Sequence, residues 1–211
     1  MRDGNPAPVT RLTDYRPPAW LVDHTRLDVD LRDGHAPVTA ELTVRRNPAR
    51  DDRPGELVLD GEHLELLSLS VDDRPLGEPE QFTLTSKVRI HPESNTALEG
   101  LYRSNGMYCT QCEAEGFRRI TFFPDRPDVL SRFTTTIHAD RAAYPLLLSN
   151  GNPVDSGDEE GGRHFATWDD PFPKPCYLFA LVAGDLACLE DSFRTASGRD
   201  VALRLYAEHR D

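Results

Sequence analysis

Basic residues are scarce in this chain of 211 residues, and lysine is almost absent. The sequence holds 24 Lys and Arg against 36 Asp and Glu, a formal net charge of −12, and its lysines are Lys87 and Lys174 alone. Nucleic-acid binding needs clustered Lys and Arg to neutralise phosphates, so the composition argues against a nucleic-acid partner. The acidic surface is expected mainly to keep the protein in solution.

Long apolar runs are also missing. No stretch approaches the roughly 20 apolar residues that a membrane-spanning helix needs, so no membrane partner is expected. Residues 1–15 lack the apolar segment of a secretory signal, which makes a cytoplasmic location the simplest interpretation. An apolar fraction of 38% with 28% charged residues is typical of a globular domain with a sizeable core.

Catalytic signatures are missing as well. The seven histidines are scattered singly, with no pair at the i, i+4 spacing of a zinc-binding helix. No serine lies in a G-x-S-x-G nucleophile elbow. This chain alone is therefore expected to hold no catalytic residue and no metal.

The four cysteines include one CxxC pair, Cys109 and Cys112. A zinc ribbon needs a second such pair, but Cys176 and Cys188 are twelve residues apart. A redox CxxC normally opens a helix in a βαβ unit, and no such unit is visible. Free thiols with a structural or incidental role are expected, and a zinc or redox module is the weaker alternative.

Short alternating segments separated by turn residues predict an all-β fold, with curved multi-stranded sheets packed as a saddle or sandwich and very little helix. One hairpin is expected around Asp33-Gly34 and a last one around Ser197-Gly198. A left-handed turn is expected within residues 149–152. Further strands are predicted at residues 64–71, 82–90 (with a change of phase), 133–139, 145–148, 164–168 and 177–182.

Several segments are expected to be irregular. Residues 1–19 contain four prolines and are predicted to form an extended arm ahead of a β-domain at 20–207, with 208–211 beginning a connection. Residues 72–75 are expected to form a turn and 125–132 one helical turn. The acidic segment 155–162 is predicted to be a loop within a second hairpin that joins 145–148 to 164–168. The alternate prolines of 169–176 predict a rigid, extended connection.

The stretch from Thr96 to Val129 has the most unusual composition. Gln111 lies in the CxxC, and Glu113, Glu115 and Gly116 follow at once. In extended backbone Gln111 and Glu113 point to the same side, so they are placed to converge on one ligand. An amide beside a carboxylate suits a primary ammonium group. Glu115 is expected to face away and to pair with one of the two arginines at 118 and 119.

Four motifs in this part of the chain and beyond it carry a family resemblance: TALEGLY, CTQCEAEGFRRITFFPDRPDV, LLLSNGN and DPFPKPCYLFALVAGD. In this order they closely resemble the amino-terminal domain of the aminopeptidase N family, which are gluzincin zinc metallopeptidases. The resemblance runs from about Tyr15 to Tyr206. The family's GAMEN and HExxH motifs are absent from this chain.

The resemblance implies a zinc-dependent enzyme that removes amino-terminal residues from peptides. It implies that this chain is the all-β domain that caps a catalytic domain missing from it, that the full-length protein holds the zinc, and that this fragment alone is inactive. Its partners would be peptides with a free amino terminus and that catalytic domain. The alternative is a stand-alone, non-catalytic β-rich binding module.

The resemblance also assigns roles to residues. Gln111 matches the position that helps to line the pocket for the first side chain, and Glu113 the position that binds the free α-amine. A cis peptide is implied at Glu113-Ala114. Residues 76–81 form a shorter connection than the family usually has. A domain separated from its partner is expected to expose an apolar patch near Gln111 and Glu113.

Overall fold

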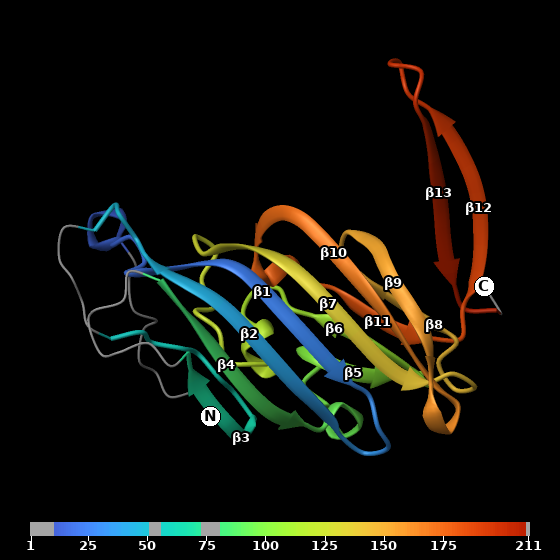
Figure 1. Ribbon diagram of the computed structural model, residues 1–211, viewed down its shortest axis with the longest axis horizontal. Helices are drawn as coiled ribbons and strands as arrows, with labels where there is room; N and C mark the ends of the chain where they lie inside the picture. The colour runs from blue at the N-terminus through green and yellow to red at the C-terminus, as the bar shows by residue number, and fades with distance from the viewer. Residues whose placement is uncertain (1–10, 51–55, 73–80, 210–211) are drawn as a thin grey trace, which may run out of the picture.

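The computed structural model describes residues 11–50, 56–72 and 81–209, and these fold almost entirely into β-strands (Figure 1). The strands are β1 Trp20–Asp30, β2 Ala36–Arg46, β3 Glu65–Val71, β4 Gln81–Ile90, β5 Gly100–Ser104, β6 Met107–Gln111, β7 Leu130–Asp140, β8 Leu146–Ser149, β9 Asn152–Glu159, β10 Arg163–Pro175, β11 Leu181–Gly184, β12 Ala187–Arg194 and β13 Asp200–Ala207. Helical structure in this part of the chain is limited to 3-10 turns, η1 Leu12–Asp14, η2 Pro92–Ser94, η3 Phe117–Arg119, η4 Glu160–Gly162 and η5 Cys176–Leu178. The predicted all-β class is confirmed. None of the described helices is long and apolar enough to cross a membrane.

The larger sheet has seven strands in the order β3-β4-β2-β1-β7-β10-β9. Its first hairpin, β1 and β2, forms where alternating apolar residues flank Asp33-Gly34, as predicted. Gly34 has φ +75°, a backbone conformation that favours glycine. β1 also pairs in parallel with β7, which brings residues more than a hundred positions apart into one sheet.

The smaller sheet has four strands in the order β5-β6-β11-β8 and lies across one face of the larger sheet (Figure 1). The buried side chains of the two sheets form one hydrophobic core. Phe117 of η3 lies at its centre, with its ring centroid 5.8 Å from that of Phe133 on β7 and 5.3 Å from that of Phe179. The core therefore ties the segment after β6 to both sheets.

The predicted change of phase in β4 is wrong. Phe82, Leu84, Val88 and Ile90 all face the core, and Ser86 occupies the inward position between them, fully buried. Its hydroxyl lies 3.3 Å from that of Thr121, which satisfies a polar group at a core position. A buried serine interrupts the apolar pattern without interrupting the strand.

The acidic segment predicted to be a loop is largely a strand. Residues 152–159 form β9, which pairs with β10, so the second hairpin is β9–β10. β8 pairs instead with β11. The turn before β9 contains Gly151 at φ +90°, which confirms the left-handed turn predicted within residues 149–152. β9 is an edge strand with mostly exposed residues, and its acidic side chains can therefore remain in water.

Two predicted boundaries need correction. Residues 125–132 form no helical turn. A tight turn at Pro127-Asp128, with the main-chain nitrogen of Val129 3.2 Å from the oxygen of Arg126, leads directly into β7. Similarly, the predicted strand at 177–182 begins as the 3-10 turn η5, and β11 starts only at Leu181. The alternate prolines before η5 are extended, as expected, and continue β10 to Pro175.

The arm and the short connection are only partly described. Residues 15–18 form no regular element, but residues 12–14, expected to be extended, form η1. The predicted turn at 72–75 and the connection at 76–81 fall mainly outside the described residues. The proposed boundaries at 19, 207 and 211 stay a prediction.

The last hairpin, β12–β13, forms around Ser197-Gly198 as predicted, with Gly198 at φ +82°. It makes a separate two-stranded sheet that projects away from the two larger sheets (Figure 1). Nearly all of its residues are exposed on both faces.

Candidate substrate-binding site

Gln111 is the last residue of β6, at the end of the smaller sheet, where it pairs with Gly100 of β5. The next residue, Cys112, is buried, and Glu113 to Gly116 then form a turn with the cis peptide expected at Glu113-Ala114. The backbone is therefore not extended through Glu113, and the strand argument for placing the two side chains together is wrong. The two residues are nevertheless in contact, because Gln111 Nε2 donates a hydrogen bond to the main-chain oxygen of Glu113 at 3.3 Å.

Two glycines allow the chain to turn so closely here. A Cβ on Gly116 would lie 2.4 Å from the main-chain oxygen of Gln111 and 2.9 Å from the nitrogen of Gly100. A Cβ on Gly100, where φ is +73°, would lie 2.7 Å from the Cβ of Arg119. Because neither position has room for a side chain, the turn packs directly on the end of β5.

A buried carboxylate anchors the turn from beneath. The Asp125 side chain is 2% exposed, and its Oδ2 accepts hydrogen bonds from Nε of Arg118 at 2.9 Å and from its main-chain nitrogen at 3.2 Å. Its Oδ1 accepts a hydrogen bond at 3.0 Å from Sγ of Cys176, the first residue of η5. The turn is thus fixed at its far end by charge-assisted bonds in a dry environment.

The charged groups around the turn are paired, with one exception. Glu115 lies 3.4 Å from a guanidinium nitrogen of Arg118, which confirms the predicted ion pair. Arg119 lies 2.6 Å from Glu62 and 3.2 Å from Glu99. Glu113 is exposed, and among the described residues no hydrogen bond or ion pair engages its carboxylate. The loop therefore presents one unpaired negative charge to solvent.

The family model for the Peptidase M1 N-terminal domain matches residues 22–178 of this chain, which include the whole loop. The chain belongs to this family. Aminopeptidase N of Caulobacter vibrioides is 54% identical, in an alignment that covers 99% of this chain and 25% of that protein. Aminopeptidase N of Escherichia coli is 51% identical, over 92% of this chain and 24% of the relative.

Solved structures of the family agree. The chain matches Legionella pneumophila aminopeptidase A, solved in complex with aspartic acid, with a TM-score of 0.85 and 36% identity, over 95% of this chain and 25% of that one. An M1 zinc metallopeptidase of Deinococcus radiodurans, bound to a Tyr-Ser-Ala substrate, shares the fold at a TM-score of 0.72 and 20% identity, over 88% of this chain and 47% of that one. The chain spans about a quarter of the length of the aminopeptidase N relatives. The predicted family resemblance is confirmed.

The CxxC of this family member forms no disulfide, and all four cysteines are free. Cys112 is buried, and its burial raises the pKa of the thiol to about 12. Burial, together with the hydrogen bond to Asp125, also raises the pKa of Cys176. Among the described residues, no three or more His, Cys, Asp or Glu side chains are grouped to hold a metal ion. The two buried thiols contribute to the packing beneath the loop.

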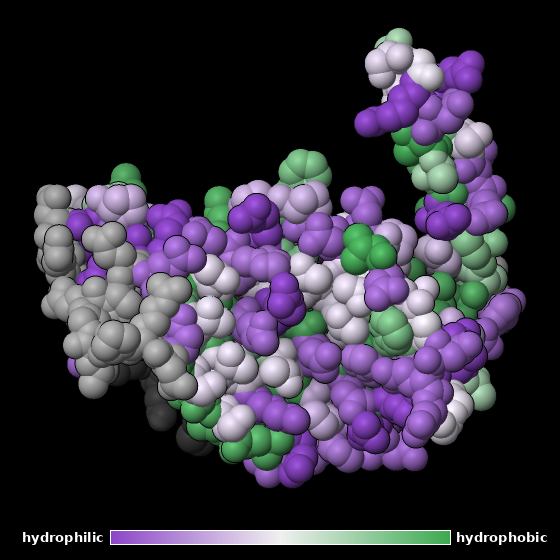
Figure 2. Space-filling view, in the orientation of Figure 1, coloured by the Kyte–Doolittle hydropathy of each residue, from purple (hydrophilic) through white to green (hydrophobic). Residues whose placement is uncertain are grey.

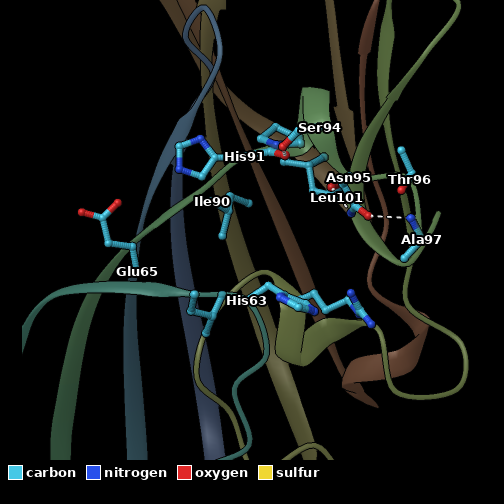
Figure 3. Close-up of a pocket in the computed structure, with 12 residues that line it drawn as sticks. His63, Glu65, Ile90, His91, Ser94, Asn95, Thr96, Ala97 and Leu101 are labelled. Carbon is cyan, nitrogen blue, oxygen red and sulfur yellow. Dashed lines mark hydrogen bonds between the residues drawn. The ribbon is translucent and has the colours of Figure 1, made fainter.

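A hollow of about 550 Å³ lies beside the candidate loop (Figure 3). His63, His91 and Asn95 line it, and Arg119 connects it to the loop, but neither Gln111 nor Glu113 reaches it. Asn95 shapes one wall, since its side chain accepts a hydrogen bond from the main chain of Ala97 and donates to that of Leu101. No sequence pattern predicts this hollow, because its lining residues come from separate segments without a shared motif.

Proposed function

We propose that this chain is the amino-terminal domain of a zinc-dependent aminopeptidase, and that it supplies substrate-anchoring groups to an active site formed with a catalytic domain later in the parent chain. Two findings support this: the family membership, and a coverage of only about a quarter of the aminopeptidase N relatives. The protein in which it works is a cytoplasmic enzyme. The fragment alone has no peptidase activity.

The exposed, unpaired carboxylate of Glu113 carries the proposal. Neighbouring acidic side chains are engaged by arginines, whereas Glu113 lies free on a turn held by glycine packing and by Asp125. A positioned carboxylate pairs well with the α-ammonium group of a peptide, because an ammonium offers three donors and a positive charge. Glu113 therefore makes binding depend on a free amino terminus.

The same contact determines which bond is cut. Holding the α-amine at a fixed point places the first peptide carbonyl one residue further along, which orients it for attack. In this proposal zinc held by the catalytic domain would supply Lewis-acid chemistry at that carbonyl. Glu113 contributes binding and orientation, not proton transfer.

Gln111 contributes to recognition of the first side chain. One of its amide hydrogens is donated to the main-chain oxygen of Glu113, which holds the amide against the main chain of Glu113 at the exposed end of β6. Its Oε1 accepts no hydrogen bond from the described residues and is free to accept one from a ligand. The first residue of the substrate would thus meet an amide next to the group that binds its amine.

Kinetics of the full-length gene product test the proposal. Alanyl and arginyl chromogenic amides are assayed with wild-type protein, Glu113→Gln and the matched control Glu115→Gln, and bound zinc is measured in each. We expect Glu113→Gln to lower kcat/KM at least 100-fold with zinc content unchanged, because a charge-assisted contact with the reacting substrate is lost. Glu115→Gln should stay within about threefold of wild type, since that carboxylate pairs with Arg118 on an exposed surface.

The isolated 211-residue chain completes the test. Hydrolysis by this fragment would contradict the proposal that catalysis requires a second domain. A full-length product without peptidase activity would instead favour the non-catalytic binding module. Equal kinetics for wild type and Glu113→Gln would leave the family membership standing and remove the anchoring role.

A further inference from the structure

Asp125 is the only acidic residue that is buried in the part of the chain that the structure describes. Hydrophilic side chains cover most of the surface visible in Figure 2. Ion pairs at a surface, such as Asp23 with Arg45, are weakened by water and by salt. A buried carboxylate is costly unless its partners are in place, so the groups that contact Asp125 are held much more firmly than those of a surface pair.

Asp125 connects three other segments of the chain. Its Oδ2 accepts two hydrogen bonds from Arg118, and its Oδ1 accepts one from Cys176. Its main-chain nitrogen donates a hydrogen bond to Oδ2 of Asp60 at 3.0 Å. Its main-chain oxygen accepts a further one from Arg118 at 3.3 Å. Removal of this one negative charge would therefore weaken several buried contacts at once.

Arg118 links Asp125 to the turn at residues 113–116. It belongs to η3, which starts directly after Gly116, and its main-chain nitrogen as well as its side chain is bound to Asp125. Gly116 is held from the other side, because its nitrogen donates to the main-chain oxygen of Cys112 at 2.9 Å. The Asp125–Arg118 pair thus fixes the start of η3, and the start of η3 fixes the end of the turn.

The position of Glu113 depends on this support. Among the described residues no hydrogen bond or ion pair engages its carboxylate, so the main chain of the turn alone determines where the carboxylate lies. A binding group has to be held within about 0.5 Å of its productive position by the residues around it. A small shift of the turn would therefore weaken recognition of an α-amine even in a protein that remains folded.

We infer that Asp125 is a positioning residue for the proposed substrate-anchoring site: through Arg118 it fixes the turn from which Glu113 binds the α-amine. Asp125 itself touches no substrate. This inference deepens the proposed function and rests on it. It does not depend on Glu115, because the contact of that exposed carboxylate with Arg118 contributes little.

Amine recognition by the full-length gene product tests this role. The ratio of kcat/KM for an alanyl amide to that for the propionyl amide, which lacks only the amine, is measured for wild type, Asp125→Asn and the matched control Asp170→Asn. Asp170 is also largely buried and pairs with Lys174 at 2.8 Å, within β10. We expect Asp125→Asn to lower the ratio at least fivefold, mainly through KM and with bound zinc unchanged, and Asp170→Asn to leave it within twofold. An unchanged ratio in Asp125→Asn would overturn the inference, whatever the loss of stability.

A double substitution shows whether Asp125 acts through Glu113. In the Glu113→Gln background, Asp125→Asn should change the ratio by less than twofold, because the group that it positions is already gone. A full fivefold effect in that background would contradict the inference.

Arg118→Lys provides the same test if Asp125→Asn does not fold. Lysine keeps the positive charge but lacks the planar Nε donor that Asp125 engages, so the same fivefold loss is expected. An unchanged ratio in Arg118→Lys would overturn the inference. If Glu113→Gln leaves the ratio unchanged, the proposed function fails and this inference fails with it. If Glu113→Gln lowers the ratio and Asp125→Asn does not, only this inference fails.

Discussion

Glu113 and Glu115 are two residues apart, yet their carboxylates lie in different environments. Arg118, held in place by Asp125, contacts Glu115 and leaves Glu113 in solvent. Arg119 is engaged by Glu62 and Glu99 and is not available to either. The positions of the two arginine side chains thus leave the Glu113 carboxylate without a partner among the described residues.

The cysteines provide a prediction at the scale of single residues. We expect Cys188, which is exposed, to react rapidly with a disulfide reagent at pH 8, and Cys112 and Cys176 to react only after unfolding. The physical reason is that burial raises the pKa of both thiols and blocks access to them. Counting released chromophore with and without denaturant checks this. A Cys188→Ser variant serves as the control, because it should lose the rapid reaction. Rapid reaction of Cys112 in the native protein would contradict this account and would favour the redox interpretation of the CxxC.

His138 provides a pH-dependent prediction. Its ring lies between Asp28, 3.2 Å from Nε2, and Glu159, 2.8 Å from Nδ1, so it links β1 and the end of β9 across β7. The hydrogen bond to Asp28, followed by that to Glu159, raises the pKa of His138 in the folded protein despite partial burial. The charged form is therefore stabilised by folding, and this contribution is fully present below the unfolded pKa near 6.5 and is lost as pH rises through the raised folded value.

We accordingly expect His138→Gln to lower the free energy of unfolding by about 1 kcal/mol at pH 5.5, and by less at pH 9. Urea denaturation at the two pH values measures the difference. His35→Gln is the matched control, because the ring of His35 contacts a main-chain oxygen and no carboxylate, and its effect should not depend on pH in this way. A larger cost of His138→Gln at pH 9 than at pH 5.5 would contradict the account.

At the scale of elements, the candidate site depends on how β6 ends. The strand stops at Gln111, the chain turns over Gly116, and η3 inserts Phe117 into the core. Rigid elements on both sides therefore position a short exposed turn. Such an arrangement holds a binding group in place better than a long loop does.

The close packing of Gly116 gives a prediction for this turn. Gly116→Ala would place a methyl group 2.4 Å from a main-chain oxygen, and the main chain cannot move aside without disturbing β5 and β6. We expect a loss of about 3 kcal/mol in the free energy of unfolding. Gly184→Ala is the control, because its Cβ would meet only the flexible side chain of Met107, and it should cost much less. Thermal or urea denaturation of both variants checks this, and equal costs would contradict the account.

Elements with strong local signals were predictable from the sequence. Alternation together with Asp33-Gly34 and Ser197-Gly198 predicted the first and last hairpins, since a short turn fixes which strands pair. The partner of β8 was not predictable, because β8 pairs with β11 and two further strands, β9 and β10, lie between them in the chain. The pairing of β9 with β10 was missed because the acidic segment was predicted to be a loop. Ser86 misled the phase of β4 because its burial depends on Thr121, in a distant segment.

The geometry of the candidate site was not predictable from the sequence, and the roles of its residues stay a prediction. Gln111 and Glu113 were identified through the family resemblance, whereas spacing alone assumed an extended backbone that the turn does not have. The ion pair of Glu115 followed from local charge. The anchoring of the turn by Asp125 and Cys176 did not, because those residues meet only in the folded core. An exposed apolar patch was expected beside Gln111 and Glu113. Exposed large apolar residues are instead most numerous along β3 and β12–β13.

At the scale of the whole molecule, two sheets share one core, the candidate turn lies at the end of the smaller sheet, and the hairpin extends away from both (Figure 1). The body is a self-contained scaffold on which Glu113 presents an unpaired carboxylate, and the hairpin lies outside the two larger sheets.

The most direct test of the central claim asks whether Glu113 recognises the α-amine itself. Full-length wild-type protein and Glu113→Gln are each assayed with an alanyl amide and with the propionyl amide that lacks only the amine, and the ratio of the two kcat/KM values is compared. The account predicts that wild type prefers the free amine by at least 100-fold and that Glu113→Gln reduces this preference to less than a tenth of its wild-type value. An unchanged preference in Glu113→Gln, even with lower activity, would show that the amine is bound elsewhere and would contradict the account.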